Sequence, residues 1–201
     1  MFKDSLQFLA DELNKYLVFK LGTAQDVERV VLGNVARAFD NDPPGNNTVP
    51  IANKAILSLV NIEEDKVAKQ QENFIRNDIS TKYKNPPVLV NVYILFSMNR
   101  SAYADSLQWL GFIIQFFQHQ NIFTPITHPS LNDKIKKLVV DLYTLNFEQV
   151  NHLWSTLGGK YLPSVMYKMR QITIDEEYVT GESGFIKEIQ LNEKLKLPVT
   201  E

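Results

Sequence analysis

The strongest β-strand pattern in the chain is Val88-Leu89-Val90-Asn91-Val92-Tyr93-Ile94-Leu95-Phe96-Ser97-Met98. Its even-numbered positions are apolar throughout, whereas the alternate set includes Asn91 and Ser97. Side chains two residues apart lie on the same face of a strand. The segment therefore predicts a long strand with one fully apolar face.

Other apolar, β-branched segments predict four more strands, at residues 27–33, 55–62, 135–143 and 165–174. Residues 55–62 are apolar on both faces, which is typical of a central strand. Between residues 66 and 85 the apolar positions Val67, Phe74 and Ile79 are too sparse to define a period. We expect a long hairpin arm or an irregular excursion there, and a loop in the turn-forming residues 40–48.

Three segments have the periodicity of amphipathic helices. The first covers residues 2–21, with Asp4 and Gln7 as a capping box and Gly22 as its end. The second runs from a cap at Ser101 to residue 120. Its predicted buried stripe comprises Tyr103, Leu107, Leu110, Ile113, Ile114 and Phe117. The third covers residues 147–157, where Asn146 and Gln149 predict a capping box.

Clustered strands with helices inserted between them are typical of an α+β domain. The predicted order is α-β-β-β-α-β-α-β, with one mixed, mostly antiparallel sheet and helices packed on one side of it. We expect this core to cover residues 1–177. Residues 178–201 are polar with scattered Ile186, Ile189, Leu191, Leu195 and Leu197, which predicts an extended C-terminal arm.

The composition is that of a globular protein, with 201 residues, 44% hydrophobic and 22% charged. A formal net charge of −2 argues against a protein that binds nucleic acid by neutralising phosphates. The chain has no cysteine, which excludes disulfides, thiolate metal sites and a cysteine nucleophile. This absence also suits folding in a reducing cytosol.

The first residues carry an acid at once and show no secretory signal. The longest apolar run, near residues 110–117, is too short to span a bilayer, which needs about 20 residues. We therefore expect assembly in the cytoplasm without a signal peptide and without direct membrane insertion. If the protein leaves the cell, it does so as part of something larger.

The residues that could carry chemistry match no known reaction centre. His119, His128 and His152 lack zinc-ligand spacing, and two acidic runs, at 63–65 and 175–177, follow predicted strands as solvated turns do. Phosphate-binding loops and nucleophile elbows are absent from the sequence. We expect no catalytic residue, no metal and no cofactor, and thus a binding or structural module rather than an enzyme.

The joint between the third helix and the last strand is the densest cluster of aromatic and polar residues. It reads Asn151-His152-Leu153-Trp154-Ser155-Thr156-Leu157-Gly158-Gly159-Lys160-Tyr161-Leu162-Pro163-Ser164-Val165-Met166-Tyr167-Lys168-Met169-Arg170. The glycine pair predicts the end of the helix, and Pro163 precedes the strand. The stretch contains no nucleophile–base pair.

Several of these segments together resemble one family, the tail-cap or tail terminator proteins of phage-tail-like contractile injection systems. The similarity lies in residues 6–14, 31–35, 53–65, 85–96, 116–118 and 123–125 and in the joint at 151–170, all in the family's order. Some relatives carry a longer C-terminal extension than this chain does.

The resemblance implies a hexameric ring that closes the distal end of the inner tube and sheath and stops their polymerisation, without a cofactor or a reaction. Its implied partners are the tube protein, the sheath protein and possibly a paralogous cap. Asn151, His152, Trp154, Tyr161 and Tyr167 are candidate interface residues, although packing within the chain explains them equally well. Lys82 and Tyr83 in the arm and Ile189 and Leu191 in the tail are further candidates.

Two other functions stay open from the residues alone. A monomeric adaptor or assembly chaperone, absent from the finished particle, is compatible with the same lack of concentrated chemistry. A hydrolase acting on a small ligand requires a deep pocket with residues of perturbed pKa. A ring-forming cap instead requires surfaces that contact neighbouring copies.

Overall fold

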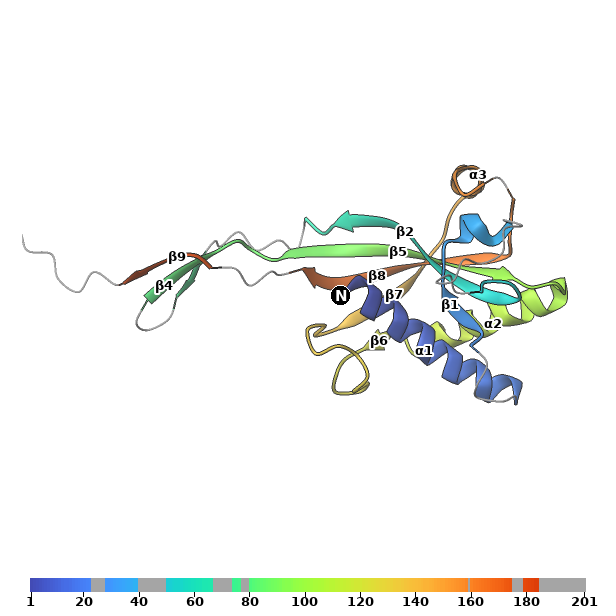
Figure 1. The fold of residues 1–201 in the computed structure, drawn as a ribbon, viewed down its shortest axis with the longest axis horizontal. Helices are drawn as coiled ribbons and strands as arrows, with labels where there is room; N and C mark the ends of the chain where they lie inside the picture. Colours follow the sequence, from blue (N-terminus) through green and yellow to red (C-terminus); the bar gives the residue numbers. More distant parts are fainter. Residues whose placement is uncertain are drawn as a thin grey trace, which may run out of the picture. The chain divides into compact units, whose positions relative to one another are not determined.

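The computed structural model describes residues 1–22, 28–39, 50–66, 74–76, 80–158, 160–174 and 179–184 (Figure 1). The chain forms two compact units. The first contains Met1–Ala68 and Val88–Ile174, and the second contains Lys69–Pro87 and Asp175–Glu201. The predicted loop at residues 40–48 lies outside the described residues.

The first unit is built on a six-stranded sheet in the order β1-β2-β5-β8-β7-β6. Its strands are β1 (Val30–Leu32), β2 (Lys54–Glu64), β5 (Val88–Asn99), β8 (Ser164–Ile174), β7 (Leu138–Tyr143) and β6 (Ile122–Phe123). Only β1 and β2 pair in parallel, and the other pairs are antiparallel. The predicted α+β class with a mixed, mostly antiparallel sheet is confirmed.

Two helices cover one face of this sheet. Helix α1 (Phe2–Leu21) and helix α2 (Tyr103–His119) pack against the apolar side of β5, which presents Val92, Ile94 and Phe96. The same main core includes the fully buried Tyr167 on β8, whose ring contacts those of Phe96 and Phe117. The alternation seen in residues 88–98 is therefore the alternation between two sides of the sheet.

The other face carries a smaller core. The short 3-10 helix η1 (Val35–Phe39) and helix α3 (Phe147–Thr156) pack there on Ile56, Leu95 and Met166. Figure 1 shows α3 on the opposite side of the sheet from α1 and α2. The expectation that all helices lie on one side was wrong, because the alternate residues of β2, β5 and β8 are also apolar in this half of the sheet.

A half-buried asparagine fixes β1 to the first helix. The Asn14 side chain on α1 accepts hydrogen bonds from the backbone N–H groups of Arg29 and Val30, each at 2.8 Å, and donates to the Val30 carbonyl at 2.9 Å. These three bonds satisfy backbone groups at the edge of the sheet. Strand β1 is therefore held from both sides, by β2 and by α1.

The helix ends test the predicted caps. Gly22 ends α1 with φ 60°, as expected, and α3 has the full capping box between Asn146 and Gln149. The predicted box of Asp4 and Gln7 was wrong, since α1 already begins at Phe2 and Asp4 pairs with the N-terminal amine at 3.0 Å. The predicted cap at Ser101 was also wrong, because α2 begins at Tyr103 after Ala102.

The buried face of α2 differs from the predicted stripe. Trp109, Ile113, Phe116 and Phe117 face the core, together with Ser106. Tyr103, Leu107 and Ile114, which we expected to be buried, are exposed. Since α2 is apolar around most of its circumference, periodicity alone could not decide which side meets the sheet.

The second unit contains a three-stranded sheet in the order β3-β4-β9. Its strands are β3 (Phe74–Arg76), β4 (Ser80–Lys84) and β9 (Val179–Gly184), all paired antiparallel. The arm predicted at residues 66–85 thus includes a hairpin, and its second strand pairs with a segment of the predicted C-terminal arm. One sheet was expected, and the described residues form two.

Candidate interface surfaces

Helix α3 packs on the sheet through the buried Trp154 and the partly buried Val150 and Leu153. Trp154 is the buried residue of this helix and packs in the smaller core beside Leu95 and Met166. Its ring meets that of Tyr161 edge to face at 5.4 Å. The capping box at the other end is complete, with Gln149 N donating to Asn146 Oδ1 at 2.8 Å and Asn146 N donating to Gln149 Oε1 at 3.0 Å.

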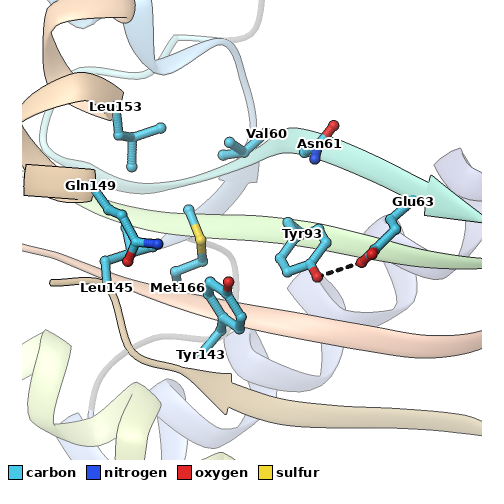
Figure 2. A pocket seen from close by; sticks show the side chains of 9 residues that line it. All are labelled: Val60, Asn61, Glu63, Tyr93, Tyr143, Leu145, Gln149, Leu153 and Met166. Carbon is cyan, nitrogen blue, oxygen red and sulfur yellow. Dashed lines mark hydrogen bonds between the residues drawn. The ribbon is translucent and has the colours of Figure 1, made fainter.

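A groove runs between α3 and the sheet, and we call it the α3 groove (Figure 2). Its volume is about 330 Å³. It is lined by Val60, Asn61, Glu63, Tyr93, Tyr143, Leu145, Gln149, Leu153 and Met166. A second hollow of about 220 Å³ shares Tyr143, Leu145, Leu153 and Met166 with it and reaches Trp154 and Tyr161. Because the two hollows share these four lining residues, they are adjacent, and both linings are largely apolar.

A polar cluster forms one end of the α3 groove. The Tyr93 hydroxyl donates a hydrogen bond to Glu63 Oε2 at 2.6 Å, and Lys168 Nζ lies 3.5 Å from the same oxygen. The lysine also sits 5.3 Å from the centre of the Tyr93 ring. The charges of Glu63 and Lys168 therefore compensate each other.

The pKa values of this cluster shift in the direction its contacts dictate. The hydrogen bond from Tyr93, and then the charge of Lys168, lower the pKa of Glu63. The same hydrogen bond raises the pKa of Tyr93, and the contact with Tyr93 raises that of Lys168. The groups stay in one protonation state around neutral pH, as suits a fixed part of a surface rather than a proton-transfer centre.

The structure separates the residues predicted for interfaces. Asn151 and His152 lie on the exposed side of α3, and Tyr161 is also exposed. Trp154 and Tyr167 are buried, in different cores on opposite faces of the sheet. As interface residues, all five stay a prediction.

The predicted residues of the arm and the tail belong to the second unit. Lys82 and Tyr83 belong to β4, where they stand opposite Glu182 and Gly181 of β9. Tyr83 is exposed. Ile189 and Leu191 lie outside the described residues.

Sequence reasoning missed the residues that shape the α3 groove. Glu63 was expected in a solvated turn, but β2 continues to Glu64 and carries Glu63 onto the face of α3. A β-bulge between Leu59 and Asn61 changes which residues face each side. The apolar pattern of the strand contains no sign of this bulge, so the alternation could not reveal the neighbours of Tyr93.

In the described ranges, histidine, aspartate and glutamate side chains form no group of three that could hold a metal ion. No helix in the part of the chain that the structure describes is long and apolar enough to cross a bilayer. The acidic run at residues 175–177 lies outside these ranges.

The chain is thus an α+β domain with open, largely apolar grooves, and the charge of Glu63 at the α3 groove is compensated by Lys168. The chain belongs to the family of the Pvc16 N-terminal domain, which it matches over residues 6–188. This match confirms the resemblance to tail terminators found in the sequence. The sequence matches none of the curated proteins.

Solved structures that resemble this chain include a sheath/tube terminator and a tube-terminating cap. The sheath/tube terminator of PVC, an extracellular contractile injection system, in its extended state, has a TM-score of 0.54 at 12% identity, covering 94% of this chain and 64% of that one. The anti-feeding prophage cap, a tube-terminating cap, has a TM-score of 0.45 at 15% identity, covering 82% of this chain and 57% of that one. The first establishes a shared fold, and this chain spans about two thirds or less of either protein.

Proposed function

We propose that the chain is the terminal cap of a contractile injection particle, closing the inner tube and sheath at their distal end. The match to the Pvc16 N-terminal domain family over residues 6–188 carries this proposal. The fold shared with a sheath/tube terminator supports it. In this role the protein acts without a reaction step or a cofactor, after assembly in the cytoplasm.

The mechanism follows from symmetry. A tube or sheath grows because each ring repeats the interface that received it. A cap that matches the last ring on one side, and offers no copy of that interface on the other, ends the growth. We propose a ring of six copies that contacts the last tube ring and the last sheath ring, with a paralogous cap as a further partner.

The predicted interface residues divide into two proposed roles. Asn151, His152 and Tyr161 are exposed and are proposed to contact partners, whereas the buried Trp154 and Tyr167 hold α3 and β8 in position. We also propose contacts for the β4 residues Lys82 and Tyr83, and for the segment with Ile189 and Leu191. Residues 178–201 are proposed to act as an arm on a core of residues 1–177.

Light scattering on the purified chain, alone and with the tube protein, tests the proposed function. We expect a hexamer, formed either in solution or on tube ends, and tubes of reduced mean length when the chain is present during their polymerisation. A monomer that leaves tube length unchanged contradicts a cap and favours an assembly adaptor. A variant lacking residues 178–201 that still forms rings and caps tubes removes the arm from the proposed contacts.

A further inference from the structure

Helix α2 presents an apolar stripe to solvent on the side away from the core. Tyr103, Leu107 and Ile114 are 64%, 48% and 39% exposed, and Leu110 lies between them, half-buried. At 3.6 residues per turn these four positions fall within about 60° of the helix circumference and extend over roughly 16 Å. Single exposed apolar residues are ordinary, but an aligned row of them marks a contact surface.

Charged side chains are nearly absent from this helix. Asp105 is its one formal charge apart from a histidine in the last turn, and Arg100 pairs with Asp105 at 2.8 Å. The exposed face of a surface helix ordinarily carries several charges. Depletion of charge together with exposed aromatic and aliphatic residues is typical of the centre of a protein interface.

A glycine flanks the stripe. Gly111 lies in the middle of α2, and a Cβ atom placed there would meet no other atom within 4 Å. The fold of this chain thus gives no packing reason for a glycine at that position. Its small surface leaves room for another chain to approach the helix closely beside Leu107 and Ile114.

The α3 groove is a matching surface on the opposite face of the sheet. Leu145, Leu153 and Met166 supply apolar contacts in it, and the charge of Glu63 is compensated by Lys168. A neutral helix can therefore enter without leaving an unpaired charge buried. The amides of Asn61 and Gln149 also line the groove.

We propose that the α2 stripe of one copy of this chain docks into the α3 groove of the next copy. The inference rests on the proposed function, since a closed ring of identical subunits needs two different, complementary surfaces on each subunit. The two surfaces lie on opposite faces of the same sheet, so one subunit can hold a neighbour on each side. The edges of the sheet, β1 and β6, are only three and two residues long and offer little for strand addition.

The absence of cysteine from the chain allows a clean cross-linking test. Leu107→Cys places one thiol on the stripe, and Gln149→Cys places one at the groove; each full-length variant is treated with a short bismaleimide, alone and mixed. We expect no cross-linked dimers from either variant alone and dimers from the mixture. The variant with both cysteines should give cross-linked oligomers of increasing size, up to the complete ring. Dimers from Leu107→Cys alone, or none from the mixture in assembled rings, would overturn the proposal.

A charge variant with a matched control checks the same contact without cross-linking. Leu107→Glu with Ile114→Glu keeps the helical circular dichroism signal, because both side chains are exposed, but we expect it to reduce the fraction of rings at least tenfold. Gln108→Glu adds charge off the stripe and leaves ring formation unchanged. Equal assembly of all three proteins contradicts the inference.

The tube protein separates this inference from the proposed function. Rings that cross-link from α2 to α3 but leave tube length unchanged support the interface and contradict the cap. In another outcome, tubes are capped, but Leu107→Cys cross-links to the tube protein and not to the Gln149→Cys variant. That result supports the cap and overturns the proposed interface between copies. A chain that stays monomeric with and without tubes contradicts both.

Discussion

Individual side chains in this protein divide into those that hold the fold and those that shape its surfaces, and the sequence distinguishes them poorly. Trp154 and Tyr161 are seven residues apart in one aromatic cluster, yet the first is buried and the second is 61% exposed. Glu63 and Tyr93 lie thirty residues apart and share a hydrogen bond. Their contact depends on strand pairing, which no local pattern in the sequence encodes.

Replacing Trp154 tests whether one side chain holds α3. Trp154→Ala removes the buried residue of the helix and leaves a cavity, so we expect a loss of about 3–5 kcal/mol in the free energy of unfolding. Urea denaturation measures this loss. Tyr161→Ala, at the exposed partner ring, is the control and is expected to cost about 1 kcal/mol. Equal losses would mean that the edge-to-face pair, rather than burial, holds the helix.

Replacing Tyr93 tests the polar cluster through its pH dependence. Tyr93→Phe removes the hydroxyl whose hydrogen bond is the largest single cause of the lowered pKa of Glu63. The pKa of Glu63 should therefore rise toward its ordinary value of 4.5. A carboxyl group with a lowered folded-state pKa stabilises the fold above its unfolded pKa, and this contribution is lost as the pH falls through the folded-state pKa. The variant should therefore lose less stability between neutral pH and pH 3 than the unaltered protein.

Carboxyl-carbon NMR titration of Glu63 measures the pKa shift directly. Lys168→Met, which removes the second contact, should also raise the pKa of Glu63, because the charge and the hydrogen bond of the lysine both lower that pKa. A Glu63 titration unchanged in both variants would mean that the cluster does not form in solution.

Whole elements were predicted well where one local signal set their limits. The strand at residues 88–98, the helix at 2–21 ended by Gly22 and the helix capped by Asn146 all lie where the sequence placed them. Their orientation was predicted less well. Helix α2 turned its predicted stripe partly to solvent because its other side, with Trp109 and Phe116, is equally apolar. The side of the sheet that α3 covers was also predicted wrongly, because the central strands carry apolar residues on both faces there.

The capping box of α3 offers a test of local helix stability. Asn146→Ala removes the acceptor of the Gln149 N–H and should lower stability by about 1 kcal/mol. Asn146→Asp keeps an oxygen acceptor at the helix N-terminus and should keep most of the stability. Thermal unfolding of the three proteins measures both changes. A loss as large with Asp as with Ala would contradict the capping role.

Two glycines in or beside helices should respond in opposite directions to the same substitution. Gly22→Ala forces a Cβ atom into the left-handed conformation at φ 60°, which costs about 1 kcal/mol. Gly111→Ala lies inside α2 in open space and should stabilise the isolated subunit by about 0.5–1 kcal/mol. Denaturant unfolding measures both, and a loss of stability from Gly111→Ala would contradict the open space beside it.

At the scale of the whole molecule, the chain combines a large unit and a small one whose strands come from separate parts of the sequence. The main core draws on α1, α2 and all six strands of the large sheet, while the small sheet depends on the pairing of β4 with β9. The sequence suggested an arm at residues 66–85 and another beyond 177. It could not suggest that they pair, because both segments are short and polar, and neither carries a pattern that specifies its partner.

Removing residues 175–201 tests the independence of the large unit. This deletion takes away β9 and leaves the six-stranded sheet complete, so we expect the cooperative unfolding transition to keep its midpoint within about 3 °C. Hydrogen exchange should show lost protection for the amides of β4 and unchanged protection for β5. A fall of the midpoint by 10 °C or more would mean that the small sheet supports the core.

The pairing of β4 with β9 also sets an order for synthesis on the ribosome. Strand β4 leaves the ribosome roughly a hundred residues before its partner, and the part of the larger unit from β5 to β8 is translated in between. The small sheet can close only after nearly all of the larger unit has been made. A translation product that stops before β9 would have the β3–β4 hairpin without its third strand. A complete small sheet therefore forms only in a chain whose large unit has already been translated.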